Sequence, residues 1–252
     1  MYINLSGLNV LLTGGGGDVG KAIASRLAES GATVALHYHK KEKEVESITR
    51  LLGNNSRAFS ANFVKNEEVG RLVKQVLDEF EEIDVLVNSV GVLLPHSFLE
   101  KDEKWLNDWQ LILQANLTSS VFLCKKLVEH WLEKKVPGRI INVGSGSALQ
   151  GEKIDKLSYA VSKAGMIALT RSIARSYAPD GIRSWVLLPG KIKSRLGGSF
   201  SQEGDDKGSK KNFRGMEPRD LAPMVAFLCS GLADYASGST IDVNTGEFFH
   251  PA

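Results

Sequence analysis

The sequence predicts an α/β protein built around one parallel β-sheet with helices on both faces. Short apolar runs alternate with longer segments of helical periodicity along the whole chain. Strands that are apolar on both sides are typical of parallel sheets buried between two helical layers. The chain has 252 residues, and α/β folds of about 250 residues commonly form one unit. We therefore expect a single domain spanning residues 1–252.

The apolar runs divide the chain into seven strands and the helices between them. Gly31 suits the position just after the first helix, and the side chain of Asn66 is expected to cap a later one. A long helical region, interrupted near its start, stops before Pro137. The predicted strands are Asn9–Thr13, Thr33–Tyr38, Arg57–Ala61, Ile83–Asn88, Arg139–Val143, Ile182–Leu188 and Thr240–Val243. The predicted helices are Asp18–Glu29, Lys41–Leu52, a segment from Asn66, Glu103–Glu133, Ser158–Tyr177 and Asp220–Cys229.

Composition argues against several classes of protein. The formal net charge of +2 gives no reason to expect nucleic acid or an anionic membrane as a partner. Cys124 and Cys229 lie in helical apolar patterns and are expected in the core, and the five histidines lack ligand spacing, so no metal is expected. We see no signal peptide and no apolar stretch near the roughly 20 residues of a membrane span. A cytoplasmic location is the resulting expectation.

A glycine-rich turn, Thr13–Gly20, joins the first strand to the first helix. In open parallel sheets this turn binds the pyrophosphate of a dinucleotide. Glycines let the backbone approach the ligand closely, and free N–H groups at a helix N-terminus attract negative charge. A flexible turn without a ligand is the alternative, but its place in the first strand–helix unit favours a dinucleotide site.

Tyr159 and Lys163 stand four residues apart on a predicted helix, which places them on the same face. A free tyrosine titrates near pH 10, and a neighbouring cation lowers the pKa of the phenol. The pair would suit a general acid/base that acts on an alcohol or carbonyl oxygen. The spacing alone is a weak signal, because many helices contain it by chance.

With these two features the chain resembles the short-chain dehydrogenase/reductase family over nearly its whole length. The family's opening motif, Thr-Gly-x-x-x-Gly-x-Gly, is matched at Thr13, Gly14 and Gly20. Asp18 replaces the middle glycine; its carboxylate could cap the helix or repel phosphate. Further matches are Asn88-Ser89-Val90-Gly91 after the fourth strand, Pro189-Gly190 after the sixth, Ser194 where a threonine often meets the nicotinamide amide, and Ser237–Gly246 around the last strand.

The resemblance implies a Rossmann-type, doubly wound sheet of about seven strands and a nicotinamide cofactor. The end of the second strand favours NADP(H), because Tyr38, His39 and Lys40 offer donors for a 2′-phosphate and no acid precedes Glu42. A solvated basic turn, with NAD as the cofactor, is the alternative. The expected cofactor-binding residues are Gly14, Gly17, Asp18, Val19, Gly20, Tyr38, His39, Lys40, Asn62, Phe63, Asn88, Gly91, Tyr159, Lys163, Pro189, Gly190 and Ile192.

By the same resemblance, Asn116, Ser145, Tyr159 and Lys163 are expected to act together on a carbonyl. Tyr159 would protonate the substrate oxygen, Ser145 would orient it, and Lys163 would lower the pKa of Tyr159 and bind the nicotinamide ribose. Asn116 would interrupt its helix and position a water linked to Lys163. Ser145 precedes Tyr159 by one residue more than in relatives, so Ser147 is the alternative serine.

The substrate is less closely defined than the reaction. We expect its wall to come from Leu93–Phe98, Ser147–Ile154 and a polar segment, 191–217, that would act as a lid. Family members of this size often reduce 3-oxoacyl groups on acyl carrier protein, and the alternatives are a pteridine, quinonoid, sugar or secondary-alcohol substrate. A catalytically silent, dinucleotide-sensing protein is the rival class. The resemblance also implies a homodimer or homotetramer formed through the long helices.

Overall fold

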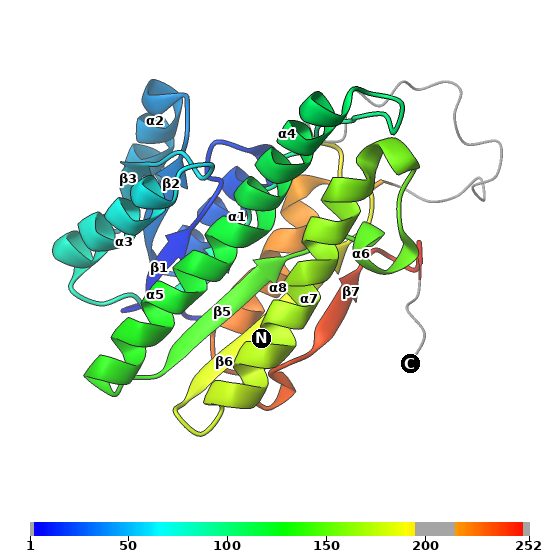
Figure 1. Ribbon diagram of the computed structural model, residues 1–252. Helices are drawn as coiled ribbons and strands as arrows, with labels where there is room; N and C mark the ends of the chain where they lie inside the picture. The colour runs from blue at the N-terminus through cyan, green and yellow to red at the C-terminus, as the bar shows by residue number, and fades with distance from the viewer. Residues whose placement is uncertain (1–2, 195–214, 249–252) are drawn as a thin grey trace.

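Seven parallel strands form one sheet in the order β3-β2-β1-β4-β5-β6-β7. The computed structural model describes residues 3–194 and 215–248, and Figure 1 shows helices on both sides of the sheet. The strands are β1 (Asn9–Leu12), β2 (Thr33–Tyr38), β3 (Arg57–Ser60), β4 (Val85–Asn88), β5 (Gly138–Val143), β6 (Ile182–Pro189) and β7 (Thr240–Val243). The principal helices are α1 (Asp18–Glu29), α2 (Glu42–Leu52), α3 (Asn66–Phe80), α4 (Asp102–Leu113), α5 (Ser119–Lys134), α7 (Leu157–Tyr177) and α8 (Pro218–Cys229). The predicted doubly wound α/β fold is confirmed.

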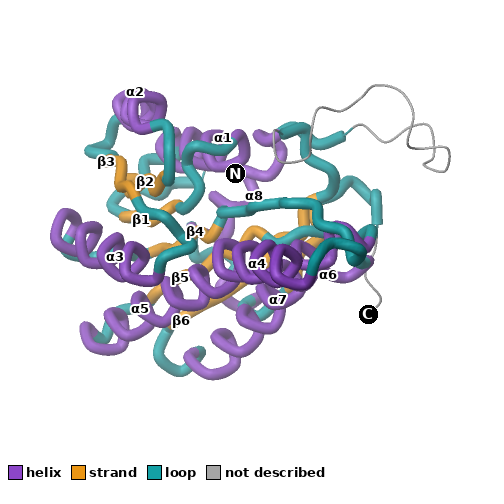
Figure 2. The backbone as a smooth tube through the Cα atoms, turned by 45° about the horizontal axis from the view of Figure 1, so that its top comes forward, coloured by secondary structure: helices purple, strands orange, loops and turns teal. Residues whose placement is uncertain are grey.

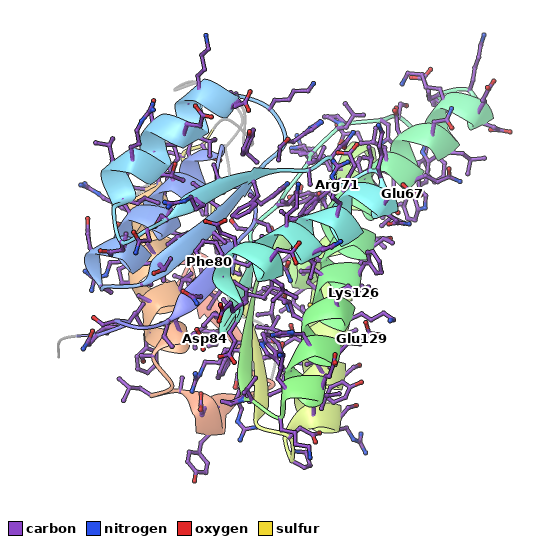
Figure 3. All side chains as sticks on the ribbon, turned by 90° about the vertical axis from the view of Figure 1, so that its left-hand side faces the viewer. Glu67, Arg71, Phe80, Asp84, Lys126 and Glu129 are labelled. Carbon is purple, nitrogen blue, oxygen red and sulfur yellow. The ribbon has the colours of Figure 1, made fainter. Side chains whose placement is uncertain are left out.

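Two hydrophobic cores lie on the two faces of the sheet. Successive side chains of a strand point to opposite faces, so Val10 and Leu12 join the core under α1 and α8 whereas Leu11 joins the core under α3 and α5. Figure 2 shows α1 and α8 on one side and α4, α5 and α7 on the other. Figure 3 shows α3 beside α5, with Lys126 on the outer surface of α5. The continuously apolar strands are therefore explained by burial on both sides.

The long helical region differs from its prediction. Its interruption lies in the middle, where a π-helical turn, Gln114–Thr118, separates α4 from α5. The combined stretch Asp102–Lys134 has a mean hydropathy of 1.2 in its most apolar window and is long enough to span a membrane by length and composition. The statement that no apolar stretch approaches that length was therefore wrong. Half of that window is buried, because these helices cover the sheet beside α3 and α7.

Two local expectations about helix ends had different outcomes. Gly31 adopts a positive φ of 98° just after α1, as predicted. Asn66 does not cap α3: the cap position is Lys65, without a side-chain bond. The Asn66 Oδ1 atom instead accepts a hydrogen bond of 2.8 Å from Gln114 Nε2, so this side chain links α3 to the π-helical turn.

The strand order places a crevice at one edge of the sheet. The chain leaves β1 toward β2 and β3, then crosses back so that β4 lies on the other side of β1. Loops following β1 and β4 therefore diverge at their carboxyl ends, where open α/β sheets bind ligands. Backbone hydrogen bonds join Lys193 to Met216 and Met216 to Lys191 at this edge. Of the proposed lid, 191–217, residues 195–214 lie outside the described part of the chain.

Candidate active site

A cleft of about 1330 Å³ opens at the carboxyl ends of the strands. It is lined by every predicted cofactor residue except Asn88, and by Ser145, Tyr159 and Lys163. Asn116 is completely buried beneath the lining. Segments far apart in the sequence thus meet at one edge of the sheet, as the predicted site requires. Among the described residues, no group of three or more His, Cys, Asp or Glu side chains could hold a metal ion.

The glycine turn is packed too tightly to hold side chains at two positions. A Cβ atom on Gly20 would lie 2.2 Å from the carbonyl oxygen of Gly14, and one on Gly15 would lie 2.3 Å from the side chain of Leu36. Gly14 also has a positive φ of 78°, which glycine adopts without strain. Asp18 is the first residue of α1, and Gly17, not Asp18, occupies the cap position. This compact turn can therefore admit a diphosphate next to its backbone.

His37 is a functional residue that the sequence analysis missed. It is 2% exposed, and its Nδ1 atom accepts a hydrogen bond of 3.2 Å from the backbone N–H of Gly14. Since Nδ1 accepts, Nε2 carries the proton and donates to the carbonyl oxygen of Ala61 at 3.0 Å. Burial lowers the pKa of His37 to about 4. Neutral His37 thus fixes the glycine turn to the end of β3.

The His37 ring also supports the part of the cleft that follows β3, where Asn62 and Phe63 are predicted to bind the cofactor. It stacks on Phe63, with 4.0 Å between ring centres and an interplanar angle of 12°. Phe63 and Asn62 line the cleft after β3, and Asn62 Oδ1 accepts from the N–H of Val64. Because β2 is buried on both faces, His37 had to lie inside the protein, unlike His39 and Lys40, which are exposed after the strand ends.

The acidic side chains that follow β2 are engaged by neighbours. The Tyr38 hydroxyl donates to Glu42 at 3.3 Å. Glu44 forms ion pairs with Lys21 and with Lys41. His39 and Lys40 are exposed at the cleft, and no ion pair involves either of them within the described part of the chain. His39 and Lys40 therefore make this end of the cleft favourable for a negatively charged group.

Asn88 and Asn116 support the cleft from below. Asn88 is 1% exposed and donates to Asn142 Oδ1 at 2.9 Å, so its expected direct contact with a cofactor is not seen in the lining. Asn116 accepts from the N–H of Val92 at 2.7 Å and donates to the carbonyl oxygen of Val92 at 2.9 Å. Both asparagines use buried amides to hold backbone or side chains that lie next to the cleft.

Ser145 and Tyr159 face each other in the cleft, and their contact favours the ionised phenol. Ser145 lies in the loop just after β5, and Tyr159 lies in the first turn of α7. Ser147, the alternative serine, directs its hydroxyl to Glu152 Oε1 at 2.6 Å. The longer loop before Tyr159 is accommodated by a short helix, Ser147–Gln150, and a 3-10 turn, Ile154–Lys156. The geometry therefore pairs Ser145, and not Ser147, with Tyr159.

The expectation that Lys163 lowers the pKa of Tyr159 is wrong for this structure. Burial raises the pKa of Tyr159, the Ser145 contact lowers it by less, and the charge of Glu152 raises it further. Lys163 Nζ lies 5.8 Å from the centre of the Tyr159 ring and donates to the carbonyl oxygens of Val90 and Val143 at 3.2 and 2.9 Å. Burial also lowers the pKa of Lys163 to about 8.

The substrate side of the cleft agrees only partly with its predicted wall. Leu93 and the segment from Ser147 to Lys153 contribute lining residues, whereas Leu94–Phe98 does not. Glu247 and Phe248 line the cleft as well and were not predicted, because they follow the last strand without any motif. A Cβ atom on Gly146 would lie 2.3 Å from the Phe248 ring, so the end of the described chain packs directly against the loop after β5.

Comparisons with known proteins identify the family. The sequence matches the family described as enoyl-(acyl carrier protein) reductase over residues 17–247. It is 35% identical over 248 residues to the 3-oxoacyl-(acyl-carrier-protein) reductase of Vibrio cholerae, covering 98% of this chain and 99% of that protein. The chain belongs to the short-chain dehydrogenase/reductase family. It is therefore an oxidoreductase of the class that acts on CH–OH and C=O groups.

Two further comparisons show the range of this dehydrogenase/reductase's relatives. It is 30% identical over 258 residues to the 3beta-hydroxysteroid dehydrogenase 1 of Eggerthella lenta, covering 100% of this chain and 97% of that protein. A short chain dehydrogenase from Burkholderia cenocepacia in complex with NADP has a TM-score of 0.84 and 25% identity, with 97% and 99% of the two chains covered. Both comparisons thus cover nearly the whole chain, although the relatives are named for different substrates.

Gly20→Ala is expected to weaken dinucleotide binding by this short-chain dehydrogenase/reductase about tenfold or more, or roughly 1.4 kcal/mol. The added methyl group would collide with the Gly14 carbonyl and open the turn. Fluorescence titration with NADPH measures the dissociation constant. Gly70→Ala in α3, where only Phe122 lies within 4 Å of the new Cβ, is the matched control and should bind as tightly as the parent. Equal affinity of the Gly20 variant would contradict a tightly packed cofactor turn.

His37 should make the protein less stable as the pH falls from about 6.5 to about 4. The folded state keeps His37 neutral, so the unfolded chain binds the proton first, and the free energy of unfolding decreases through this interval by about 3 kcal/mol. Denaturant unfolding at several pH values measures this slope, and His37→Gln should reduce it. An identical slope in parent and variant would show that His37 is not responsible.

Proposed function

We propose that this protein is an NADP(H)-dependent reductase of a ketone, with a 3-oxoacyl thioester as the favoured substrate. The observation that carries the proposal is the meeting of Tyr159 and Ser145 in the same cleft as the tightly packed glycine turn. A proton donor for the substrate oxygen thereby lies in the same cleft as a cradle suited to a dinucleotide.

The residues present fit such a cofactor. Gly14 and Gly20 leave room for a diphosphate at the start of α1, and Lys40 and His39 offer cationic or hydrogen-bonding groups to a 2′-phosphate. NADPH, when bound, supplies the hydride that reduces a carbonyl carbon. The NADP complex of the relative from Burkholderia cenocepacia supports this choice of dinucleotide.

The catalytic assignment follows from the positions of four side chains. Tyr159 donates its phenol proton to the substrate oxygen, and Ser145 hydrogen-bonds the same oxygen to orient it. Lys163 holds the ends of β4 and β5 through the carbonyl oxygens of Val90 and Val143, and it would contact the nicotinamide ribose from there. Asn116 fixes Val92 and belongs to the predicted proton relay.

The substrate class rests on relatives and on charge. The relative from Vibrio cholerae reduces 3-oxoacyl groups by its name, and Lys153, Lys156 and Lys191 lie around the substrate side of the cleft. Basic groups there favour an acidic carrier or another anionic substrate. A steroid alcohol is the second candidate, because the Eggerthella lenta relative is named for one. A panel of acyl thioesters, ketones and steroids with NADPH distinguishes these substrates.

Association into a homodimer or homotetramer is part of the proposal. Partly exposed apolar side chains lie along the long helices: Leu106, Val121, Leu132 and Val161 are between 37% and 49% exposed. Trp105 and Trp109, both on α4, stack on each other with 5.4 Å between ring centres. An outer helical face of this composition suits contact with a second copy. Cytoplasmic location is proposed on the same footing, from the resemblance to the reductases above.

Tyr159→Phe should abolish NADPH-dependent reduction while leaving NADPH affinity within about twofold of the parent. Removal of the hydroxyl deletes the proton donor but keeps the ring, and loss of a general acid commonly reduces the rate by about 10²–10⁴-fold. Turnover on the best substrate of the panel and fluorescence titration give the two measurements. Undiminished turnover would refute the proposed mechanism, and parent enzyme inactive on the whole panel would favour the silent dinucleotide sensor.

Lys40→Glu should reduce kcat/KM for NADPH about 10- to 100-fold and leave kcat/KM for NADH nearly unchanged. The new carboxylate would repel the 2′-phosphate, which NADH lacks. Lys43→Glu is the charge-matched control, because Lys43 is exposed on α2 and is not among the residues lining the cleft. Equal losses with both cofactors, or a parent enzyme that prefers NADH, would contradict the assignment of Lys40.

A further inference from the structure

A chain of hydrogen bonds runs from the active serine to the cleft surface. Ser145 Oγ lies 3.1 Å from Ser147 Oγ, and Ser147 Oγ lies 2.6 Å from Glu152 Oε1. The N–H of Ser147 also donates to Ser145 Oγ at 3.2 Å. Ser147 and Glu152 belong to the loop that is one residue longer than in relatives, and both line the cleft. None of the roles assigned so far uses this chain.

The carboxylate fixes the direction of every bond in the chain. A carboxylate only accepts hydrogen bonds, so Ser147 donates its single hydroxyl proton to Glu152. Ser147 then has no proton for Ser145, and Ser145 must be the donor in their contact. Without substrate, the proton of Ser145 is thereby directed to Ser147, and it becomes available to a substrate oxygen only when Ser145 leaves that bond. The remaining lone pair of Ser145 faces Tyr159 and can only accept from its hydroxyl.

We propose that Glu152 is a positioning residue that acts through Ser147 and Ser145 to keep the proton on Tyr159 until substrate binds. For Tyr159 to ionise, Ser145 would have to turn its proton back toward the phenolate and break its bond to Ser147. The chain adds to the cost of that rotation. This inference rests on the proposed role of Tyr159 as the proton donor, and it assigns the longer loop a function in favouring the reductive direction.

The charges around Tyr159 support the same direction. Burial raises the pKa of Tyr159 most, and the negative charge of Glu152 raises it further. A hydrogen bond from Ser145 to the phenolate lowers this pKa, and that is the bond that the chain to Glu152 opposes. Lys163, the cation one turn after Tyr159 on α7, donates its hydrogen bonds to two backbone carbonyl oxygens. The other charged groups on the substrate side of the cleft, within the described residues, are Lys153, Lys156, Lys191 and Glu247. Of these charged side chains, Glu152 is the one whose charge raises the pKa of Tyr159.

A simpler reading is that the chain only fastens the loop. Glu152 is exposed, and a staple between Ser147 and Glu152 would order the residues before α7. A hydrogen bond with only this structural role would affect the stability of the protein and its affinity for substrate, but it would leave the titration of Tyr159 unchanged. The ionisation of Tyr159 is therefore the property that separates the two readings.

The experiment is a pH titration of tyrosinate absorbance in the near ultraviolet, without substrate. Each protein is titrated both with Tyr159 and with the further substitution Tyr159→Phe. The difference between the two absorbance curves is the titration of Tyr159. Glu152→Gln and Ser147→Ala should both move its ionisation to lower pH, by about 0.5–1 unit, which is the effect of one nearby charge or one charge-linked hydrogen bond. Ser147→Thr keeps the hydroxyl and should titrate like the parent. Glu133 is exposed near the C-terminal end of α5 and does not line the cleft. Glu133→Gln removes the same charge there and should leave the ionisation of Tyr159 unchanged.

Two results would overturn the proposal. The first is an unchanged titration of Tyr159 in Glu152→Gln. The second is a shift in Glu152→Gln without a shift in Ser147→Ala, which would show that the charge acts alone and the serine chain does not. Thermal melting of each variant confirms that the titrated protein is folded. The absorbance measurement does not require turnover. A negative titration would therefore overturn the role of Glu152 alone, whereas the proposed function is tested separately by the activity of Tyr159→Phe. The alkaline decline of kcat/KM for NADPH-dependent reduction should move in the same direction as the absorbance.

Discussion

Backbone groups that leave the sheet at the carboxyl ends of the strands must find new hydrogen-bond partners, and this requirement shapes the cleft. The strands diverge there, and a buried unpaired N–H or C=O group is costly. Polar side chains from other elements supply the partners. Thr13 bonds to the carbonyl of Val87 and the N–H of Ser89, His37 to Gly14 and Ala61, Asn116 to both backbone groups of Val92, and Lys163 to Val90 and Val143.

Each of these side chains also fixes a part of the site. Thr13 joins the glycine turn to the loop after β4, and His37 joins it to the end of β3. Lys163 connects the ends of β4 and β5, so the ammonium that serves the proposed chemistry also holds two walls of the cleft together. The site is therefore rigid for reasons of hydrogen-bond satisfaction, and its chemistry uses groups that the fold already needs in these places.

The sequence predicted the fold and most of the site because the relevant signals are local. Alternating apolar runs located the strands, and Thr13–Gly20 and the Tyr159–Lys163 spacing located the two halves of the cleft. His37 was missed because its bonds to Gly14 and Ala61 join residues more than 20 positions apart. The burial of Asn88 could not be judged for a similar reason, since its partner Asn142 comes from another strand. The pKa of Tyr159 depends on burial and on Glu152, and neither can be judged from spacing along one helix.

The two backbone bonds between Lys191–Lys193 and Met216 have a consequence for how this enzyme can diversify. They clamp the two ends of the intervening segment together beside the substrate side of the cleft. Loop-closure entropy grows slowly with length, by about 0.6 kcal/mol for each doubling, so the clamp separates that segment from the stability of β6 and α8. A change in the number of residues between the two paired ends therefore costs little free energy and leaves β6, α8 and the glycine turn in place. The length of the chain here and the stability of the fold can, in this sense, evolve separately.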